Sequence, residues 1–193
     1  MFIQHSHQPA LRQSRARGFT LIELIAVLVI AGILATFAAG RFFQRDTFDA
    51  RAFADQAIDL LRYGQKLAVA QNRPVYVRLD GQSVALCFDA LCSAAARVRP
   101  AVGSNNGSKE TLAYCSNSRD WLCAGRPDKV TLSILAVVPA HGSGFYFDAL
   151  GQPYETADVF PAASTFGRAL TLRVQGDGMN RDIVVESGTG YVH

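Results

Sequence analysis

The chain has 193 residues, 49% hydrophobic and 18% charged, which is enough apolar material for one sizeable core or two small ones and excludes a disordered chain. The formal net charge is +3, but three of the 19 basic residues (Arg12, Arg15 and Arg17) precede Gly18 in a stretch without acids. After Gly18 there are 16 basic and 16 acidic residues, whose charges cancel. This balance argues against a globally basic nucleic-acid coat protein, although a local basic patch stays possible.

Residues 19–40 form an apolar segment of 22 residues whose only charge is Glu23. About 20 apolar residues span a bilayer core as a helix, whereas the apolar region of a secretory signal usually has about 7–15. The preceding arginines favour a cytoplasmic N-terminus by the positive-inside rule. The sequence therefore predicts a single-pass membrane segment with the rest of the chain on the periplasmic or extracellular side.

Two other interpretations of this segment remain. The first is a cleaved export signal, because Ala38, Ala39 and Gly40 are small residues of the kind that signal peptidase accepts. The second is a plain signal anchor. Neither accounts for Glu23, because a carboxylate costs about 2.5–3.5 kcal/mol at a bilayer centre and somewhat less near the interface. Glu23 is either an acid that snorkels to the interface or a functional residue.

Residues 41–73 predict an amphipathic continuation of this helix. Apolar residues recur at roughly helical spacing among charged ones, and they include Phe48, Phe53, Ile58 and Leu61. Pro74 ends the pattern. One helix from Phe19 to about Asn72 would be roughly 80 Å long at 1.5 Å per residue.

The remaining residues, 74–193, predict strands and turns. Residues 74–79 and 83–88 alternate around Asp80-Gly81-Gln82, which is typical of a hairpin. Further strands are expected at residues 130–138, 144–148, 169–175 and 181–186. The fold class is therefore α+β, with one or two antiparallel sheets packed on the C-terminal half of the helix. Residues 94–126 are rich in Gly, Ser and Asn and predict a long surface loop.

All four cysteines, Cys87, Cys92, Cys115 and Cys123, follow the membrane segment and so lie on the oxidising side, where disulfides form. Three pairings are open, and Cys87–Cys92 with Cys115–Cys123 is preferred because each closes a loop within one local segment. Zinc ligands would be more closely paired and no histidine is near, so no metal is predicted.

Catalysis finds little support in the sequence. Gly142-Ser143-Gly144 lacks the spacing of a nucleophile elbow, and the glycines beside His141 are typical of a turn. No triad, no histidine and carboxylate metal set and no glycine-rich phosphate loop can be assembled. We expect no catalytic residues and no cofactor.

A binding loop is better motivated, because residues 97–129 hold six basic against three acidic residues. Phosphate contacts with aromatic stacking would suit nucleic-acid binding, although a solvated loop of mixed charge has the same composition. A disulfide between Cys115 and Cys123 would brace this loop as a surface for a partner. The candidate nucleic-acid or partner residues are Arg97, Arg99, Arg119, Trp121 and Arg126.

The stretch Arg17-Gly18-Phe19-Thr20-Leu21-Ile22-Glu23 resembles the class III signal of type IV prepilins and type II secretion pseudopilins. The resemblance implies a leader, residues 1–18, that prepilin peptidase removes by cutting between Gly18 and Phe19, followed by N-methylation of Phe19. It also implies that Glu23 neutralises the Phe19 amine of its own or a neighbouring subunit as filaments assemble. The two groups are four residues apart on one helix face, close enough to pair where an unpaired charge is penalised.

Residues 61–68, 147–154 and 183–193 resemble the GspH/FimT type of minor pilin, and most closely the MshC type of the mannose-sensitive haemagglutinin (MSHA) pilus. This resemblance implies a pilin fold and an inner-membrane protein that later enters a pilus or pseudopilus. The implied partners are other major and minor pilins, prepilin peptidase and the inner-membrane assembly platform. Two alternatives remain open: a type II secretion pseudopilin of the GspH type and a DNA-binding minor pilin of the FimT type.

Overall fold

The computed structural model describes residues 19–42, 45–101, 105, 107–135, 144–176 and 178–193, with the backbone alone for 36–42 and 45–47. The leader, Gly18, His141 and the end of the strand expected at 130–138 lie outside the described residues. The chain divides into two compact units, residues 1–43 and 44–193. The continuity of the long helix predicted from Phe19 to Asn72 stays a prediction, because residues 43 and 44 are not described.

The first unit contains one helix, α1, Leu21–Phe42. Its only charged residues are Glu23 and Arg41, and its leucine, isoleucine and valine side chains between residues 21 and 34 are all exposed by half or more. An apolar helix without a polar face buries its surface only against lipid or other protein. Within the described part of the chain, no helix is long and apolar enough to cross a membrane.

The second unit begins with α2, Arg45–Gln71. Its apolar stripe packs on the sheets as predicted, with Phe53, Ile58 and Leu61 buried. Phe48 departs from that stripe, because its side chain is 65% exposed. The helix ends where Asn72 adopts a positive φ of 49° and the Asn72 and Arg73 amides donate to the carbonyls of Val69 and Ala68. This is a Schellman cap with asparagine in the left-handed position.

A five-stranded antiparallel sheet has the order β3-β2-β1-β5-β6. Its strands are β1 Val75–Leu79, β2 Ser83–Cys87, β3 Cys123–Gly125, β5 Gly144–Phe147 and β6 Pro153–Glu155. The predicted hairpin is confirmed, because Leu79 lies opposite Val84 and Gly81 takes the positive φ that the turn needs. A second antiparallel sheet has the order β4-β7-β8, with β4 Thr131–Leu135, β7 Leu170–Gly176 and β8 Met179–Val185.

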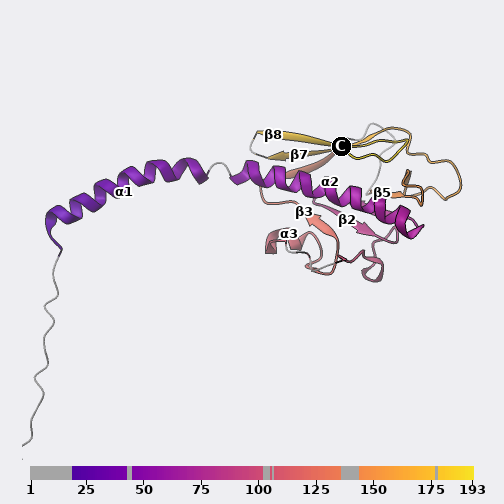
Figure 1. The fold of residues 1–193 in the computed structure, drawn as a ribbon, viewed down its shortest axis with the longest axis horizontal. Coiled ribbons are helices and arrows are strands. Elements are labelled where there is room, and N and C mark those ends of the chain that lie inside the picture. Colours follow the sequence, from indigo (N-terminus) through magenta and orange to yellow (C-terminus); the bar gives the residue numbers. More distant parts are fainter. Residues whose placement is uncertain (1–18, 43–44, 102–104, 106, 136–143, 177) are drawn as a thin grey trace, which may run out of the picture. The chain divides into compact units, whose positions relative to one another are not determined.

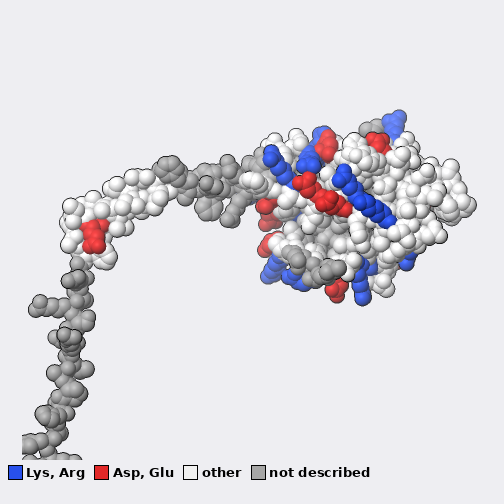
Figure 2. All heavy atoms as spheres, in the orientation of Figure 1, with Lys and Arg blue, Asp and Glu red and all other residues white. Residues whose placement is uncertain are grey.

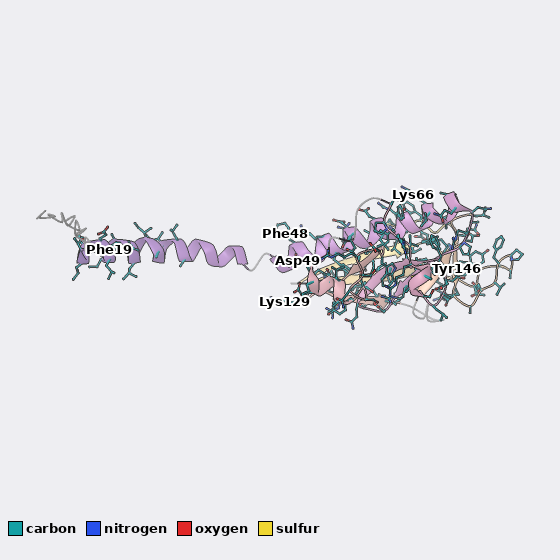
Figure 3. The ribbon with its side chains drawn as sticks, turned by 90° about the horizontal axis from the view of Figure 1, so that it is seen from below. Phe19, Phe48, Asp49, Lys66, Lys129 and Tyr146 are labelled. Atoms are coloured by element: carbon teal, nitrogen blue, oxygen red, sulfur yellow. A yellow bond between two sulfur atoms is a disulfide. The ribbon has the colours of Figure 1, made fainter. Side chains whose placement is uncertain are left out.

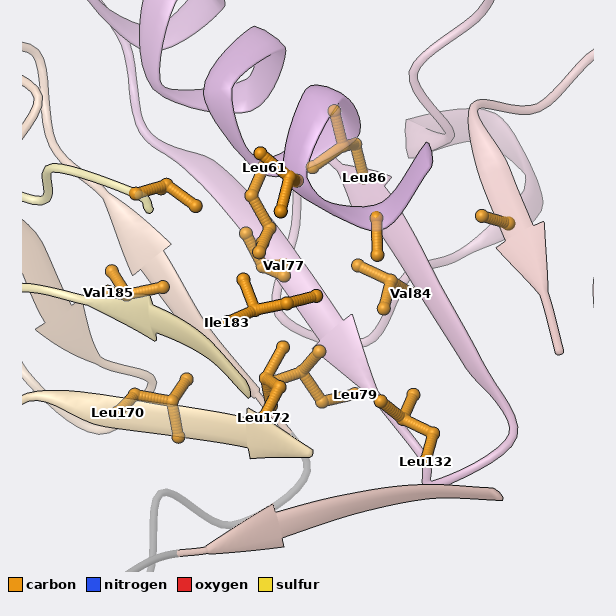
Figure 4. Packing of buried hydrophobic residues seen from close by; sticks show 14 of the residues in the cluster. Leu61, Val77, Leu79, Val84, Leu86, Leu132, Leu170, Leu172, Ile183 and Val185 are labelled. Carbon is orange, nitrogen blue, oxygen red and sulfur yellow. The ribbon is translucent and has the colours of Figure 1, made fainter. Parts of the chain in front are cut away.

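The core lies where α2 meets the inner faces of both sheets (Figure 1). Alternation along β1 points Val75, Val77 and Leu79 into this core. Figure 4 shows Leu61 of α2 above Val77 and Ile183, which come from different sheets. Complete burial of each such side chain stabilises the fold by roughly 1.5–3 kcal/mol. The predicted antiparallel sheets packed on a helix are therefore confirmed.

The surface loop predicted for residues 94–126 is only partly correct. This segment contains a short 3-10 helix, η1 Ala94–Ala96, the helix α3 Lys109–Ala113 and the edge strand β3. The Thr111 amide donates to Ser108 Oγ, which caps α3 at its N-terminus. Elements of three to five residues are too short to show a hydrophobic period, and β3 forms because it pairs with β2.

Candidate processing and assembly site

The start of α1 is organised by Thr20. The Glu23 amide donates to the Thr20 carbonyl at 3.1 Å and to Thr20 Oγ1 at 3.4 Å. Thr20 is therefore the N-cap, and Glu23 stands at the third helical position, as in a capping box. Thr20 was not predicted as a cap, although threonine followed by glutamate three residues later is the sequence signal for one.

Phe19 and Glu23 are both in the described part of the first unit. The Phe19 side chain is 77% exposed and Glu23 is exposed in the first turn of α1. No ion pair of Glu23 occurs among the described residues. The positive end of the helix dipole stabilises a carboxylate at this position, and a new amine at Phe19 would lie within one turn of it. The site therefore has the chemistry to hold one ammonium group beside one carboxylate.

The C-terminal residues are fastened to α2 by two of its polar side chains. Arg62 Nε and Nη2 donate to the Val192 carbonyl at 3.1 and 3.0 Å. Gln65 Nε2 donates to the carbonyls of Gly151 and Thr189, both at 2.9 Å. The segments that resemble minor pilins at residues 61–68, 147–154 and 183–193 thus meet in one place, where their contacts stabilise the fold.

Trp121 is not available for stacking on a base, so that expectation is wrong. Its side chain is 0% exposed and its Nε1 donates to the Leu86 carbonyl at 2.9 Å. The guanidinium groups of Arg78 and Arg97 lie 4.6 and 4.3 Å from its ring centroid. Trp121 belongs to a second buried cluster with both disulfides, and it serves packing.

The other candidate binding residues are only partly free for a ligand. Arg97 packs on Trp121, and Arg126 donates to the Val130 carbonyl at 2.9 Å and lies over the Tyr114 ring. Arg99 is exposed, and exposed Arg119 donates to the Asn105 carbonyl at 3.2 Å. Figure 2 shows basic and acidic side chains interspersed on the face in view. Two of the four predicted arginines, Arg97 and Arg126, are therefore engaged in contacts within the fold.

Both preferred disulfides are confirmed. Cys87 is bonded to Cys92 and Cys115 to Cys123, with Cα–Cα distances of 5.2 and 5.8 Å. Each bond closes a local loop, as the spacing indicated. Among the described residues there is no group of three or more His, Cys, Asp or Glu side chains arranged to hold a metal ion.

The segment after β6 is held by Asp158. Its carboxylate accepts the Glu155 amide at 3.0 Å and the Thr165 amide at 2.8 Å. Burial raises the pKa of Asp158, but the hydrogen bond from the Thr165 hydroxyl at 2.7 Å and the two amide bonds outweigh it and hold the pKa below its usual value. The Tyr146 hydroxyl donates to the Asp158 carbonyl at 3.2 Å, and burial raises the pKa of Tyr146 to about 12.

An exposed apolar helix with an acid in its first turn, joined to a disulfide-stapled α+β unit, defines a pilin-like protein. Residues 13–39 match the prokaryotic N-terminal methylation motif. The chain is 30% identical over 119 residues to the type IV narrow pilus major component PilA5 of Thermus thermophilus, covering 62% of this chain and 88% of that protein.

Two crystal structures of the Pseudomonas aeruginosa type IV minor pilin FimU resemble the chain, with TM-scores of 0.49 and 0.47 at 15% and 14% identity. They cover 76% and 74% of this chain and 88% and 90% of the FimU chains. On the sequence match to PilA5 and the methylation motif, the chain belongs to the type IV pilin family. Members of this family are structural subunits that interact with other pilins.

Proposed function

We propose that this protein is a minor pilin of an MSHA-like type IV pilus, cut by prepilin peptidase between Gly18 and Phe19 and N-methylated at Phe19. Residues 19–40 hold it in the inner membrane, with the N-terminus in the cytoplasm and residues 41–193 in the periplasm. The inner-membrane assembly platform then moves it into a filament, at or near the tip, where it primes or supports assembly.

One observation carries the proposal. The methylation motif covers residues 13–39, and within it Glu23 is a lone carboxylate on an otherwise apolar, uncovered helix. Such an acid is expensive in a membrane unless a positive group pairs with it. The Phe19 amine that cleavage would create is the nearest source of that charge.

Intact mass and N-terminal sequencing of the protein from native membranes test the processing. We expect a chain that begins at methylated Phe19 and depends on prepilin peptidase, whereas a bulky replacement of Gly18 should block the cut. A chain that begins after Gly40 would indicate an exported protein, and an uncut Met1 would indicate a plain anchor. Either result would remove the proposed function.

Replacement of Glu23 tests assembly separately. Glu23→Ala should leave cleavage intact and impair incorporation into filaments, because the amine loses its partner. Glu23→Gln is the matched control for side-chain size, and it should fail in the same way. Normal filaments with Glu23→Ala would refute the pairing.

A second candidate is a repeating subunit, which the relative PilA5 favours because it is a major pilus component. Quantifying this protein in sheared filaments separates the two, since a minor pilin is a small fraction of the filament mass. Pseudopilin and DNA-binding roles remain alternatives, but the burial of Trp121 and the packing of Arg97 weaken the nucleic-acid one.

A further inference from the structure

A groove of about 510 Å³ lies at the C-terminal end of α2, between the turn after β5 and the segment after β6. The rings of Tyr76 and Tyr146, from neighbouring strands, line it with their centroids 5.0 Å apart. Figure 3 shows Tyr146 toward the end of the second unit that is opposite Phe48. We call this surface the distal groove and define it by six of its residues, Tyr76, Tyr146, Asp148, Leu150, Val159 and Phe160.

The rim of the distal groove is apolar and exposed. Leu150, Val159 and Phe160 are 73%, 75% and 56% exposed. The wall is well anchored, because Asp158 and the Tyr146 hydroxyl hold the segment that carries Val159 and Phe160. An exposed apolar rim on a braced wall is typical of a surface that binds another protein.

The charges that line the distal groove are mostly negative. Two carboxylates, Asp148 and Asp158, line it with a single guanidinium, that of Arg73. Arg73 already lies over the Phe88 ring, 3.7 Å from its centroid. Neither carboxylate forms an ion pair among the described residues, and the donors to Asp158 are neutral amides and a hydroxyl, which leave its charge in place. The groove therefore favours a positively charged occupant.

The carboxylate of Asp148 gives a second, independent reason. Its side chain is 2% exposed, and its Oδ1 accepts the amides of Leu150 and Gln152 at 2.9 and 2.7 Å. Its Oδ2 is buried without a hydrogen-bond partner in the described part of the chain. Buried polar atoms are nearly always satisfied, so one that is not, in the wall of a groove, indicates a missing partner. Because a charge in this wall is screened less than one in water, it attracts a cation that enters the groove.

The aromatic and apolar residues indicate which kind of cation fits. The faces of aromatic rings such as Tyr76 and Phe160 attract a guanidinium group, which can also stack on them. The apolar rim covers the methylene groups that carry such a head group. Arginine is enriched at protein interfaces whereas lysine is depleted there. An arginine framed by apolar residues on the surface of a protein therefore matches the groove in charge, shape and polarity.

We propose that the distal groove binds an arginine side chain of a different pilin, with Asp148 as the residue that selects the charge. Leu150, Val159 and Phe160 then contact the apolar residues around that arginine. The inference rests on the proposed function, because a minor pilin has few copies in a filament and its neighbours are therefore other pilins.

The test uses the full chain in its native host, with the photo-cross-linking residue p-benzoylphenylalanine in place of Val159. Irradiation of filaments should join the chain to one other pilin. Mass spectrometry of the joined peptides should place the bond within a few residues of an arginine of that pilin. Replacing that arginine with alanine should lower the cross-linked fraction at least tenfold.

Asp148→Asn tests the charge with little change in shape. The asparagine Oδ1 still accepts the amides of Leu150 and Gln152, while its NH2 group takes the place of Oδ2. We expect at least tenfold less cross-linking and an unchanged urea midpoint of the full chain. Asp120→Asn is the matched control, because it removes the same charge at an exposed position outside the groove, and it should cross-link normally.

Several outcomes would overturn this contact and leave the proposed function intact. They are filaments that contain the chain but give no cross-link from position 159, a bond to a segment without arginine, and a bond to a second copy of this chain. Undiminished cross-linking with Asp148→Asn or with the partner's alanine variant would do the same. If Asp148→Asn lowers the urea midpoint, the partner's alanine variant alone decides. If the unaltered chain never enters filaments, both proposals fail.

Discussion

Removing the Cys115–Cys123 disulfide should destabilise the second unit by an amount that follows from its loop length. The two residues are 0% and 6% exposed and belong to the same buried cluster as Trp121. The variant Cys115→Ala with Cys123→Ala opens the loop without leaving a buried thiol. It keeps the Cys87–Cys92 bond in place.

The magnitude comes from the entropy of the unfolded chain. A bond between residues 8 apart in sequence closes a short loop, for which the chain-entropy relation gives about 2.6 kcal/mol at 25 °C. The Cys87–Cys92 bond joins residues 5 apart, and the same relation gives about 2.2 kcal/mol. The two double variants should therefore lose similar amounts, with the larger loss at Cys115–Cys123.

Urea unfolding of the full chain in a mild detergent, followed by tryptophan fluorescence, measures this loss directly. Trp121 is the single tryptophan of the chain, so its emission reports on the cluster that contains the bond. Leu91→Ala, at a 91% exposed position inside the other loop, is the control and should change stability by less than about 0.5 kcal/mol. A loss below about 1 kcal/mol for Cys115→Ala with Cys123→Ala would refute the reasoning.

Three further predictions concern the same unit. Trp121→Ala should lower the free energy of unfolding by about 3–5 kcal/mol through loss of buried contacts, whereas an unchanged urea midpoint would show that the ring is not packed. Stability should fall as pH rises from about 10 to 12, because burial raises the pKa of Tyr146 to about 12 and the same tyrosine ionises at lower pH in the unfolded chain. Tyr146→Phe should flatten this dependence of the free energy of unfolding on pH in urea titrations. An identical slope would contradict the role of Tyr146. Gly144→Ala should prevent normal pairing of β1 with β5, because the alanine Cβ would meet the Val77 carbonyl oxygen. Gly178→Ala is the control for backbone strain, because Gly178 also has a positive φ but open space around it. Equal stability of the two variants in thermal unfolding would count against the clash.

Several features could be predicted because their signals are local. The hairpin of β1 and β2 follows from alternation around Asp80 and Gly81, and the strands β7 and β8 follow from the alternating runs at residues 169–175 and 181–186. The disulfides follow from short spacing, because a local loop costs the chain little entropy to close. The position of Glu23 in the first turn of α1 follows from the motif itself.

Other features depend on contacts between distant residues, which the sequence alone does not display. Trp121 looked like an exposed aromatic in a polar loop, and it is buried because β2, Arg78 and Arg97 surround it. Phe48 matched the helical period, yet it is 65% exposed, and Ala50 is the first buried residue among the described side chains of α2.

The amino-acid sequence by itself determined the processing motif, the apolar helix, most strands and the preferred cysteine pairs, since each is specified by residues close together in the chain. The tertiary structure alone decided the short elements within residues 94–126, the fastening of the C-terminal residues by Arg62 and Gln65, and the burial of Trp121. These features depend on strand order and side-chain packing between segments up to 130 residues apart, where local propensity carries no information.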